Sequence, residues 1–210
     1  MSAVMMLSSP PTPLALRSSF SDDSSLATIE KPHDALHRTF EPTVSPVSQV
    51  RALLAPYGPL PSRPQQTTCK TADADYTVDV VNAIRANDLA TLRRLPNTVN
   101  MNASNNNGES LLHLACRRSN LDTIRFLVLE AKVNLLAQDS LGRTALHDVC
   151  WRPTLQVEIL DLFLSQCDDP TVLIAPDVRG HTPLDYVRTT EWPQWNAYLA
   201  SRQSALLQKM

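Results

Sequence analysis

The sequence predicts an all-α fold in which pairs of short helices repeat along the chain and short β-hairpin turns join the pairs. The main observation is a repeated motif. The motif DSLGRTALH, which begins at Asp139, returns at Asp177 as DVRGHTPLD, and a weaker copy, NNNGESLLH, begins earlier at Asn105. Three of the four glycines of the chain occupy the same position in these copies. A unit of this length cannot bury its own apolar face, so neighbouring units are expected to stack.

Residues 1–72 are expected to form a disordered arm rich in serine and proline. Ten of the sixteen prolines lie before residue 73, and no helical period is sustained there. One short helix is expected within this arm. Ser45 is a suitable cap, Pro46 suits the first helical position, and Val50 and Leu54 lie on one face. Three interpretations of this helix remain open: a docking segment for a partner, a transient helix, and a helix that packs on the folded part.

The folded domain is expected to span residues 73–210 and to contain four units of two helices each. Apolar residues at helical spacing, interrupted by Asn87 and Asp88, predict the two helices of the first unit. In the third unit, four extra residues lengthen the step to the next motif; two are expected between the helices and two after the second helix. In the fourth unit, residues 191–193 are expected to form the turn before the last helix. The units cover about residues 74–104, 105–138, 139–176 and 177–208.

The repeated motif resembles the ankyrin repeat, whose signature is Thr-Pro-Leu-His-x-Ala after a turn containing Asp and Gly. The resemblance covers about residues 74–208 and is strong in units two to four, whereas the first unit lacks the turn signature. It implies that each glycine takes positive φ in a hairpin, that Ser or Thr caps the first helix, and that the histidine bonds backbone and cap groups. The last unit departs from the pattern with Asp185 in place of histidine. The signature positions are Gly108, His113, Gly142, Thr144, His147, Gly180, Thr182 and Pro183.

The resemblance implies a binding scaffold without chemistry of its own, so we expect neither enzymatic activity nor a cofactor. Ankyrin-repeat proteins commonly bind protein partners through their hairpin tips and through the concave face formed by the first helices. Carried over to this sequence, the tip residues are Asn106, Asn107, Glu109, Ser140, Leu141, Arg143, Val178, Arg179 and His181. The candidates on the concave face are Arg117, Arg118, Asp148 and Arg152.

Trp151, Trp192 and Trp195 are all expected near the inter-helix turns of units three and four. Two interpretations remain open. The tryptophans seal the C-terminal end of the stack, which no further repeat covers, or an exposed tryptophan beside Arg152 forms a binding hot spot. We favour the first interpretation, and we count Trp151 and Trp192 among the candidate partner-binding residues.

Two histidine patterns raise the alternative of a metal-dependent hydrolase. The pattern His-x-x-Cys occurs at 113–116 and again at 147–150 and suggests a zinc site. Packing is the favoured interpretation, because adjacent helices lie about 10 Å apart whereas zinc ligands lie about 2.0–2.3 Å from the metal. His33 and His37 follow the spacing of a zinc-protease helix, but prolines bracket this segment and no third ligand is evident. We therefore predict no metal site.

Charge and composition limit the possible partners. The arm, 1–72, carries six Lys/Arg and five Asp/Glu, a net charge of +1, and the remaining thirteen and sixteen give −3. Neither value favours nucleic acid or a charged membrane surface, and no apolar run approaches the roughly 20 residues of a membrane span. The four cysteines contain no Cys-x-x-Cys pair, which is typical of a reducing compartment. We expect a monomeric adaptor for a protein partner in the cytoplasm or nucleus.

An organellar protein is the alternative to this cytoplasmic or nuclear adaptor. The stretch 1–21 contains six serines, Arg17 and no acidic residue, a composition typical of a transit segment. Asp22, Asp23 and the frequent prolines argue against it. Under this alternative, the segment is cleaved and the repeats act as an assembly factor or chaperone inside the organelle.

Overall fold

The computed structural model describes residues 44–59, 61–62, 72–118 and 120–209. All of these belong to one compact unit, Glu41–Met210, and the His33 and His37 pattern lies outside the described residues. The α-helices are α1 (Pro46–Leu54), α2 (Val78–Ala86), α3 (Leu89–Arg94), α4 (Leu111–Arg118), α5 (Leu121–Arg125), α6 (Ala145–Cys150), α7 (Val157–Gln166) and α8 (Trp192–Leu207). Single turns of 3₁₀ or π helix are η2 (Ala55–Tyr57), η3 (Phe126–Glu130), η4 (Pro170–Ile174), η5 (Pro183–Tyr186) and η6 (Thr189–Glu191).

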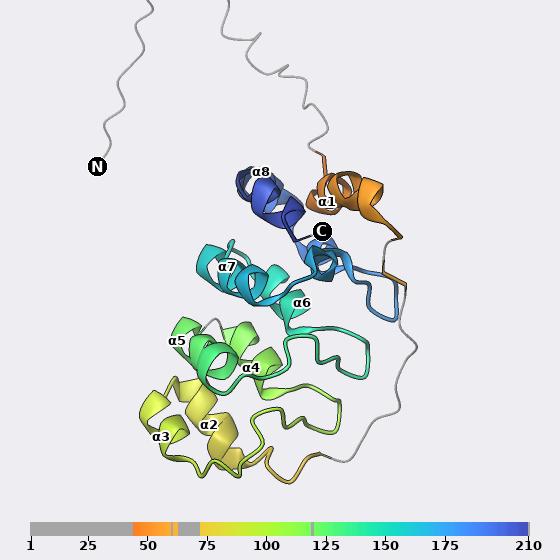
Figure 1. Cartoon of the computed structure of the whole chain (residues 1–210). Coiled ribbons are helices and arrows are strands. Elements are labelled where there is room, and N and C mark those ends of the chain that lie inside the picture. Colours follow the sequence, from red (N-terminus) through yellow and green to blue (C-terminus); the bar gives the residue numbers. More distant parts are fainter. Residues whose placement is uncertain (1–43, 60, 63–71, 119, 210) are drawn as a thin grey trace, which may run out of the picture. The chain divides into compact units, whose positions relative to one another are not determined.

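The predicted all-α repeat architecture is confirmed. Helix pairs α2–α3, α4–α5 and α6–α7 stack one on the next (Figure 1), and α4 packs between α2 and α6. Antiparallel bridges join Ser104 to Ser110 and Gln138 to Thr144 at the bases of two hairpins. The hairpin glycines have φ values of 74° (Gly108), 73° (Gly142) and 89° (Gly180). These left-handed conformations favour glycine, which has no side chain to clash.

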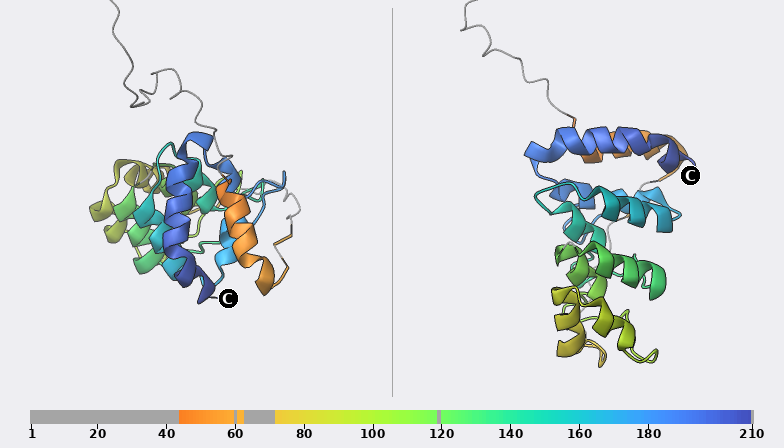
Figure 2. Two further views of the ribbon diagram at one scale, coloured as in Figure 1. Left: turned by 90° about the horizontal axis from the view of Figure 1, so that it is seen from above. Right: turned by 90° about the vertical axis from the view of Figure 1, so that its left-hand side faces the viewer.

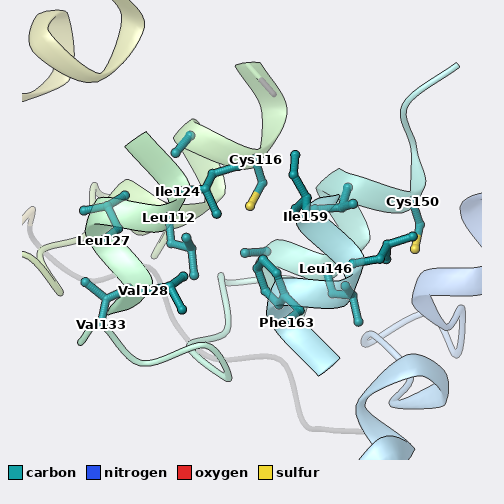
Figure 3. Close-up of a cluster of buried hydrophobic side chains, with 14 of the residues drawn as sticks. Leu112, Cys116, Ile124, Leu127, Val128, Val133, Leu146, Cys150, Ile159 and Phe163 are labelled. Carbon is teal, nitrogen blue, oxygen red and sulfur yellow. The ribbon is translucent and has the colours of Figure 1, made fainter. Parts of the chain in front are cut away.

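The core between the second and third units is built from both helices of each unit. Figure 3 shows Leu112 and Leu127 of the second unit opposite Leu146 and Phe163 of the third, and all four are buried. The second helix of unit two does not continue as a regular α-helix after Arg125. It widens into the π turn η3, in which the Ala131 N–H donates to the Phe126 carbonyl at 2.9 Å.

A histidine joins the third unit to the next hairpin. His147 Nδ1 accepts a hydrogen bond from the Thr144 backbone N–H at 3.0 Å. The other ring nitrogen, Nε2, therefore carries the proton and donates to the His181 carbonyl at 3.4 Å. Burial lowers the pKa of His147 to about 4, which keeps the ring neutral at pH 7. His113 makes equivalent contacts one unit earlier.

The fourth unit closes the stack with a shortened first helix. Only the 3₁₀ turn η5 remains, and Asp185 occupies the histidine position. A single Asp185 carboxylate oxygen accepts hydrogen bonds from the Thr182 N–H and from Thr182 Oγ1, both at 2.8 Å. In the described part of the chain no hairpin follows, so an imidazole N–H would have no carbonyl to bond. An aspartate keeps the cap contacts and leaves no donor unsatisfied.

The prediction of a turn at residues 191–193 is wrong. Trp192 and Pro193 are the first two residues of α8. Proline marks the start of this helix because the first helical turn has no backbone N–H bond to lose and the fixed φ of proline suits it.

The helix predicted within the arm is present as α1, and it packs on the folded part. Ser45 Oγ caps it by accepting from the Ser48 N–H at 3.2 Å. Helix α1 lies beside α8, at the end of the stack opposite α2 and α3 (Figure 2). Asn196 Nδ2 of α8 donates to the Val44 carbonyl at 2.6 Å. The predicted boundary at residue 72 is thereby corrected, since α1 belongs to the same compact unit as the repeats.

Candidate functional site

The hairpin tips form a continuous ridge because each tip bonds to the next. The Ser140 N–H donates to the Asn107 carbonyl at 2.8 Å, and the Val178 N–H donates to the Leu141 carbonyl at 2.9 Å. At the N-terminal end, the Ala72 N–H donates to an Asn106 side-chain oxygen at 2.7 Å. Side chains of the tip candidates are exposed at Asn106, Asn107, Arg179 and His181, and half-buried at Glu109, Ser140, Leu141, Arg143 and Val178.

Each tip is held by a turn residue that is not among the predicted sites. Asp139 Oδ1 accepts from the Leu141 and Arg143 N–H groups at 2.9 and 2.8 Å. Asp177 and Asn105 play the same part in the following and preceding hairpins. All three begin a copy of the repeated motif, and that shared position is the signal that could have identified them. A hairpin fixed in this way presents its side chains in one arrangement.

A network of charges lies at the junction of the second and third units. Arg117 Nη2 donates to Glu109 Oε1 at 2.7 Å, and Arg117 Nε lies 3.5 Å from Asp148 Oδ1. Arg143 Nη2 pairs with Asp139 at 2.6 Å and lies 3.9 Å from Glu109 Oε1. The Arg117 side chain is 38% exposed, whereas that of Asp148 is 9% exposed. The carboxylates therefore lie beneath, and the guanidinium groups lie above them nearer the solvent.

The environment of the two acids at this junction differs. Burial raises the pKa of Asp148, and the neighbouring Arg117 only partly offsets that effect. Burial also raises the pKa of Glu109, but hydrogen bonds from Asn105 and Arg117 outweigh it, and the net shift is downward. Glu109 thus remains ionised and holds Arg117 in place.

The C-terminal ends of the first helices α4 and α6 are joined to one another. Arg152 Nη1 donates to the Arg117 carbonyl at 2.8 Å. Trp151 directly follows α6 as its C-cap residue and is 60% exposed, and Arg118 is the last residue of α4 and has an exposed side chain. We call the hairpin tips together with α4 and α6 the inner face. Trp151, Arg118 and Arg179 of this face are exposed and make no side-chain hydrogen bond or ion pair with the described residues.

The three tryptophans do not form one group. Trp195 is 1% exposed and belongs to the core. Trp192 packs against that core, and its indole N–H donates to the Val187 carbonyl at 3.3 Å. Both help to close the C-terminal end of the stack, as the favoured interpretation expects, whereas the exposure of Trp151 does not fit a sealing role. The joint placement of all three near inter-helix turns is corrected accordingly.

The histidine and cysteine pairs serve the packing of the repeats. Both ring nitrogens of His113 and of His147 are engaged in hydrogen bonds within and between units. The thiols of Cys116 and Cys150 are free and buried, and burial raises the pKa of each. Among the described residues, no group of three or more His, Cys, Asp or Glu is placed to hold a metal ion.

Comparisons with known proteins identify the repeat. Residues 80–174 match the family model for ankyrin repeats, with three copies. Among solved structures, the crystal structure of the ankyrin repeat domain of Bcl-3, "a unique member of the IkappaB protein family", is 26% identical with a TM-score of 0.50. That match covers 61% of this chain and 57% of the Bcl-3 chain, so this chain spans little more than half of it. The search of curated proteins gives no match.

The matched range covers the first three units and leaves out the fourth, whose first helix is reduced to a 3₁₀ turn. No helix in the described part of the chain has the length and hydropathy needed to cross a bilayer. Ankyrin repeats are in general modules of protein–protein interaction. Residues 80–174 are therefore ankyrin repeats.

Proposed function

We propose that this chain is a non-enzymatic scaffold that binds a protein partner through its inner face. One contrast carries the proposal. Asp139 and Asp148 are buried and Glu109 is 19% exposed, and all three are paired with arginines, whereas Trp151 and Arg118 are exposed at the ends of the first helices. Tryptophan and arginine are the residues most enriched among binding hot spots.

The support beneath these side chains favours binding as well. Arg117 is held by Glu109, and Arg152 by the Arg117 carbonyl. A partner that pairs with these guanidinium groups immobilises side chains that are already partly ordered, so the loss of conformational entropy on binding is smaller. Arg179 extends the same surface along the tip ridge.

The wider role remains a prediction. An adaptor needs a second docking surface, and α1, one candidate for it, is packed against α8. The sequence features of the organellar alternative lie within residues 1–43, outside the described residues. We keep the cytoplasm or nucleus as the expected location and a monomer as the expected state.

Two triple variants of the full chain test the proposal. The first, Arg118→Ala, Trp151→Ala and Arg179→Ala, removes three exposed side chains of the inner face. The control, Arg94→Ala, Arg125→Ala and Val157→Ala, removes two exposed arginines and one exposed apolar side chain from second helices. With each as bait, we expect the recovery of the partners of the unmodified chain to fall at least tenfold with the first variant only. Equal losses with both, or full recovery with the first, would contradict the proposal.

A further inference from the structure

Two grooves lie at equivalent places in successive units. Each forms where a second helix ends and its loop runs on to the next hairpin. The first groove, of about 640 Å³, lies between units one and two and is lined by residues 92–93 and 95–102 with Phe126, Glu130 and Ala131. The second groove, of about 540 Å³, lies between units two and three and is lined by residues 128–129, 132–136, 166–169 and Val172.

The first groove is bridged by polar contacts between its walls. An Asn102 side-chain oxygen accepts from the Asn134 N–H of the next loop at 2.6 Å. Arg93 on one wall pairs with Glu130 on the other at 2.6 Å. The side chains of Asn102, Arg93 and Glu130 are therefore used to hold units one and two together.

The second groove has an apolar side chain, Leu136, where the first has the polar Asn102. Leu136 stands one repeat after Asn102, at the same place in its loop, and offers no acceptor to the next unit. Leu136 is 55% exposed, and Leu129 in the same groove is 46% exposed. They are two of only seven large apolar side chains that are exposed in the described part of the chain.

Irregularities of the repeat shape both walls of the second groove. One wall is the π turn η3, after which Lys132 takes a positive φ of 50°. The other wall contains Cys167–Asp169, within the stretch after α7 where the sequence predicts two extra residues. Lys209 Nζ donates to the carbonyls of Leu164 and Cys167 at 2.6 and 2.7 Å. This contact caps the C-terminal end of α7 and fixes the wall.

The charges of the second groove define what suits it. Asp169 uses its carboxylate to bond the Thr171 N–H and hydroxyl at 2.8 and 2.7 Å. Asp168 is exposed and has no hydrogen bond or ion pair with any described residue. Lys132, the one cationic side chain of the described lining, is also exposed. An apolar floor with an available carboxylate at its edge complements an apolar side chain next to a cation.

We propose that this groove is a docking site for a short segment of a second partner protein. The segment places a leucine-sized side chain between Leu129 and Leu136, and a lysine or arginine beside it pairs with Asp168. The groove and the inner face share no residue, so this site goes beyond the proposed function. With both surfaces occupied, the chain holds two partners at once.

A random dodecapeptide library displayed on phage, selected on the immobilised full chain, tests the proposal. Peptides are then counter-screened on Leu136→Asn, which copies Asn102 of the first groove, and on Leu129→Ser. Both positions are about half exposed, so thermal melting should stay close to that of the unmodified chain. We expect a group of peptides with an apolar residue beside Lys or Arg, whose affinity falls at least tenfold on either variant and several-fold on Asp168→Asn.

Controls separate this site from the inner face. Affinity should not change on Asn97→Ala with Thr98→Ala in the first groove, nor on the inner-face triple variant. The proposal is overturned if no selected peptide is lost on the Leu129 and Leu136 variants. It is equally overturned if the peptides that depend on this groove are acidic, or if their affinity depends on the inner face.

Discussion

Helix α1 should detach from the stack when Leu54 is replaced by alanine. Its buried side chains are Pro46, Val47, Val50 and Leu54. At about 1.5–3 kcal/mol for each buried aliphatic side chain, docking of these four contributes roughly 6–12 kcal/mol. Ordering the nine residues of the helix costs about 1 kcal/mol each, roughly 9 kcal/mol in total. The two contributions nearly cancel, so α1 is held by no more than a few kcal/mol.

Replacing Leu54, which is 1% exposed, removes about 2–3 kcal/mol of burial. That is comparable with the whole free energy of docking. We expect Leu54→Ala to release α1 while the repeats stay folded, and the free energy of unfolding to fall by only about 1–2 kcal/mol. Leu127→Ala, at a fully buried position between units, should instead destabilise the whole stack by about 3–4 kcal/mol.

Hydrogen exchange followed by mass spectrometry distinguishes the two variants, together with urea unfolding. In Leu54→Ala, backbone amides of α1 should exchange more than tenfold faster, since about 1.4 kcal/mol corresponds to a factor of ten, while those of α4 and α6 should not change. In Leu127→Ala, exchange should rise throughout the repeats. If Leu54→Ala accelerates exchange in all helices alike and lowers the unfolding free energy as much as Leu127→Ala, α1 is an integral part of the cooperative core and the reasoning fails.

Three further predictions concern the repeats themselves. The pKa of His147 is about 4 in the folded state and about 6.5 in the unfolded chain. The stability that the neutral ring contributes to the fold is therefore fully present above pH 6.5 and is lost as the pH falls toward 4. In urea unfolding, this histidine should lower the free energy of unfolding by about 2–3 kcal/mol at pH 4.5 relative to pH 7. His147→Asn should make the free energy of unfolding depend less on pH. An equally steep pH dependence in the variant would refute the role given to His147. Gly108→Ala should lower the free energy of unfolding by about 2–3 kcal/mol, because φ is positive and a Cβ would lie 3.2 Å from the Asp139 backbone. Gly180→Ala, with open space around the added Cβ, should lower it by about 1 kcal/mol. Equal melting temperatures of the two variants would contradict the role of the close contact. Asp161→Asn breaks the paired hydrogen bonds from Arg202 at 2.8 and 2.7 Å. Because both side chains are more than a third exposed, the free energy of unfolding should fall by less than about 1 kcal/mol. A larger drop would show that α8 depends on this pair.

The elements that the sequence predicts well are those with local causes. A glycine that must take positive φ, a capping Ser or Thr and a run of apolar residues at helical spacing all act within a few residues. Helix α1 is predictable for the same reason, but helical spacing of Val50 and Leu54 does not reveal which surface covers them. The covering surface is formed by α8 and by the turns η4 and η5, all far along the chain from α1, and only tertiary structure shows it.

The errors at the C-terminal end have a similar origin. The sequence predicts a turn at Pro193 because proline interrupts helices, yet proline also favours the first turn of a helix. The sequence around it does not decide between these two roles. At the candidate site, Arg117 and Asp148 are both predicted to face a partner, but pairing between the second and third units leaves Asp148 buried. Such pairing depends on how two units stack and is not evident from either unit alone.

Differences between equivalent positions of successive units indicate where a partner is expected to bind. In a stack, most repeated positions are used by contacts between neighbours, as His147 and Asn102 are, and changes there weaken the stack. Leu136 occupies the position of Asn102 but makes no such contact with the next unit. A hydrogen bond of that kind contributes about 1 kcal/mol, so its absence and the exposure of a leucine both act against stability. A position that gives up a stabilising contact while exposing apolar surface is better explained by binding than by folding, and this argument favours the second groove over any regular position of the repeat.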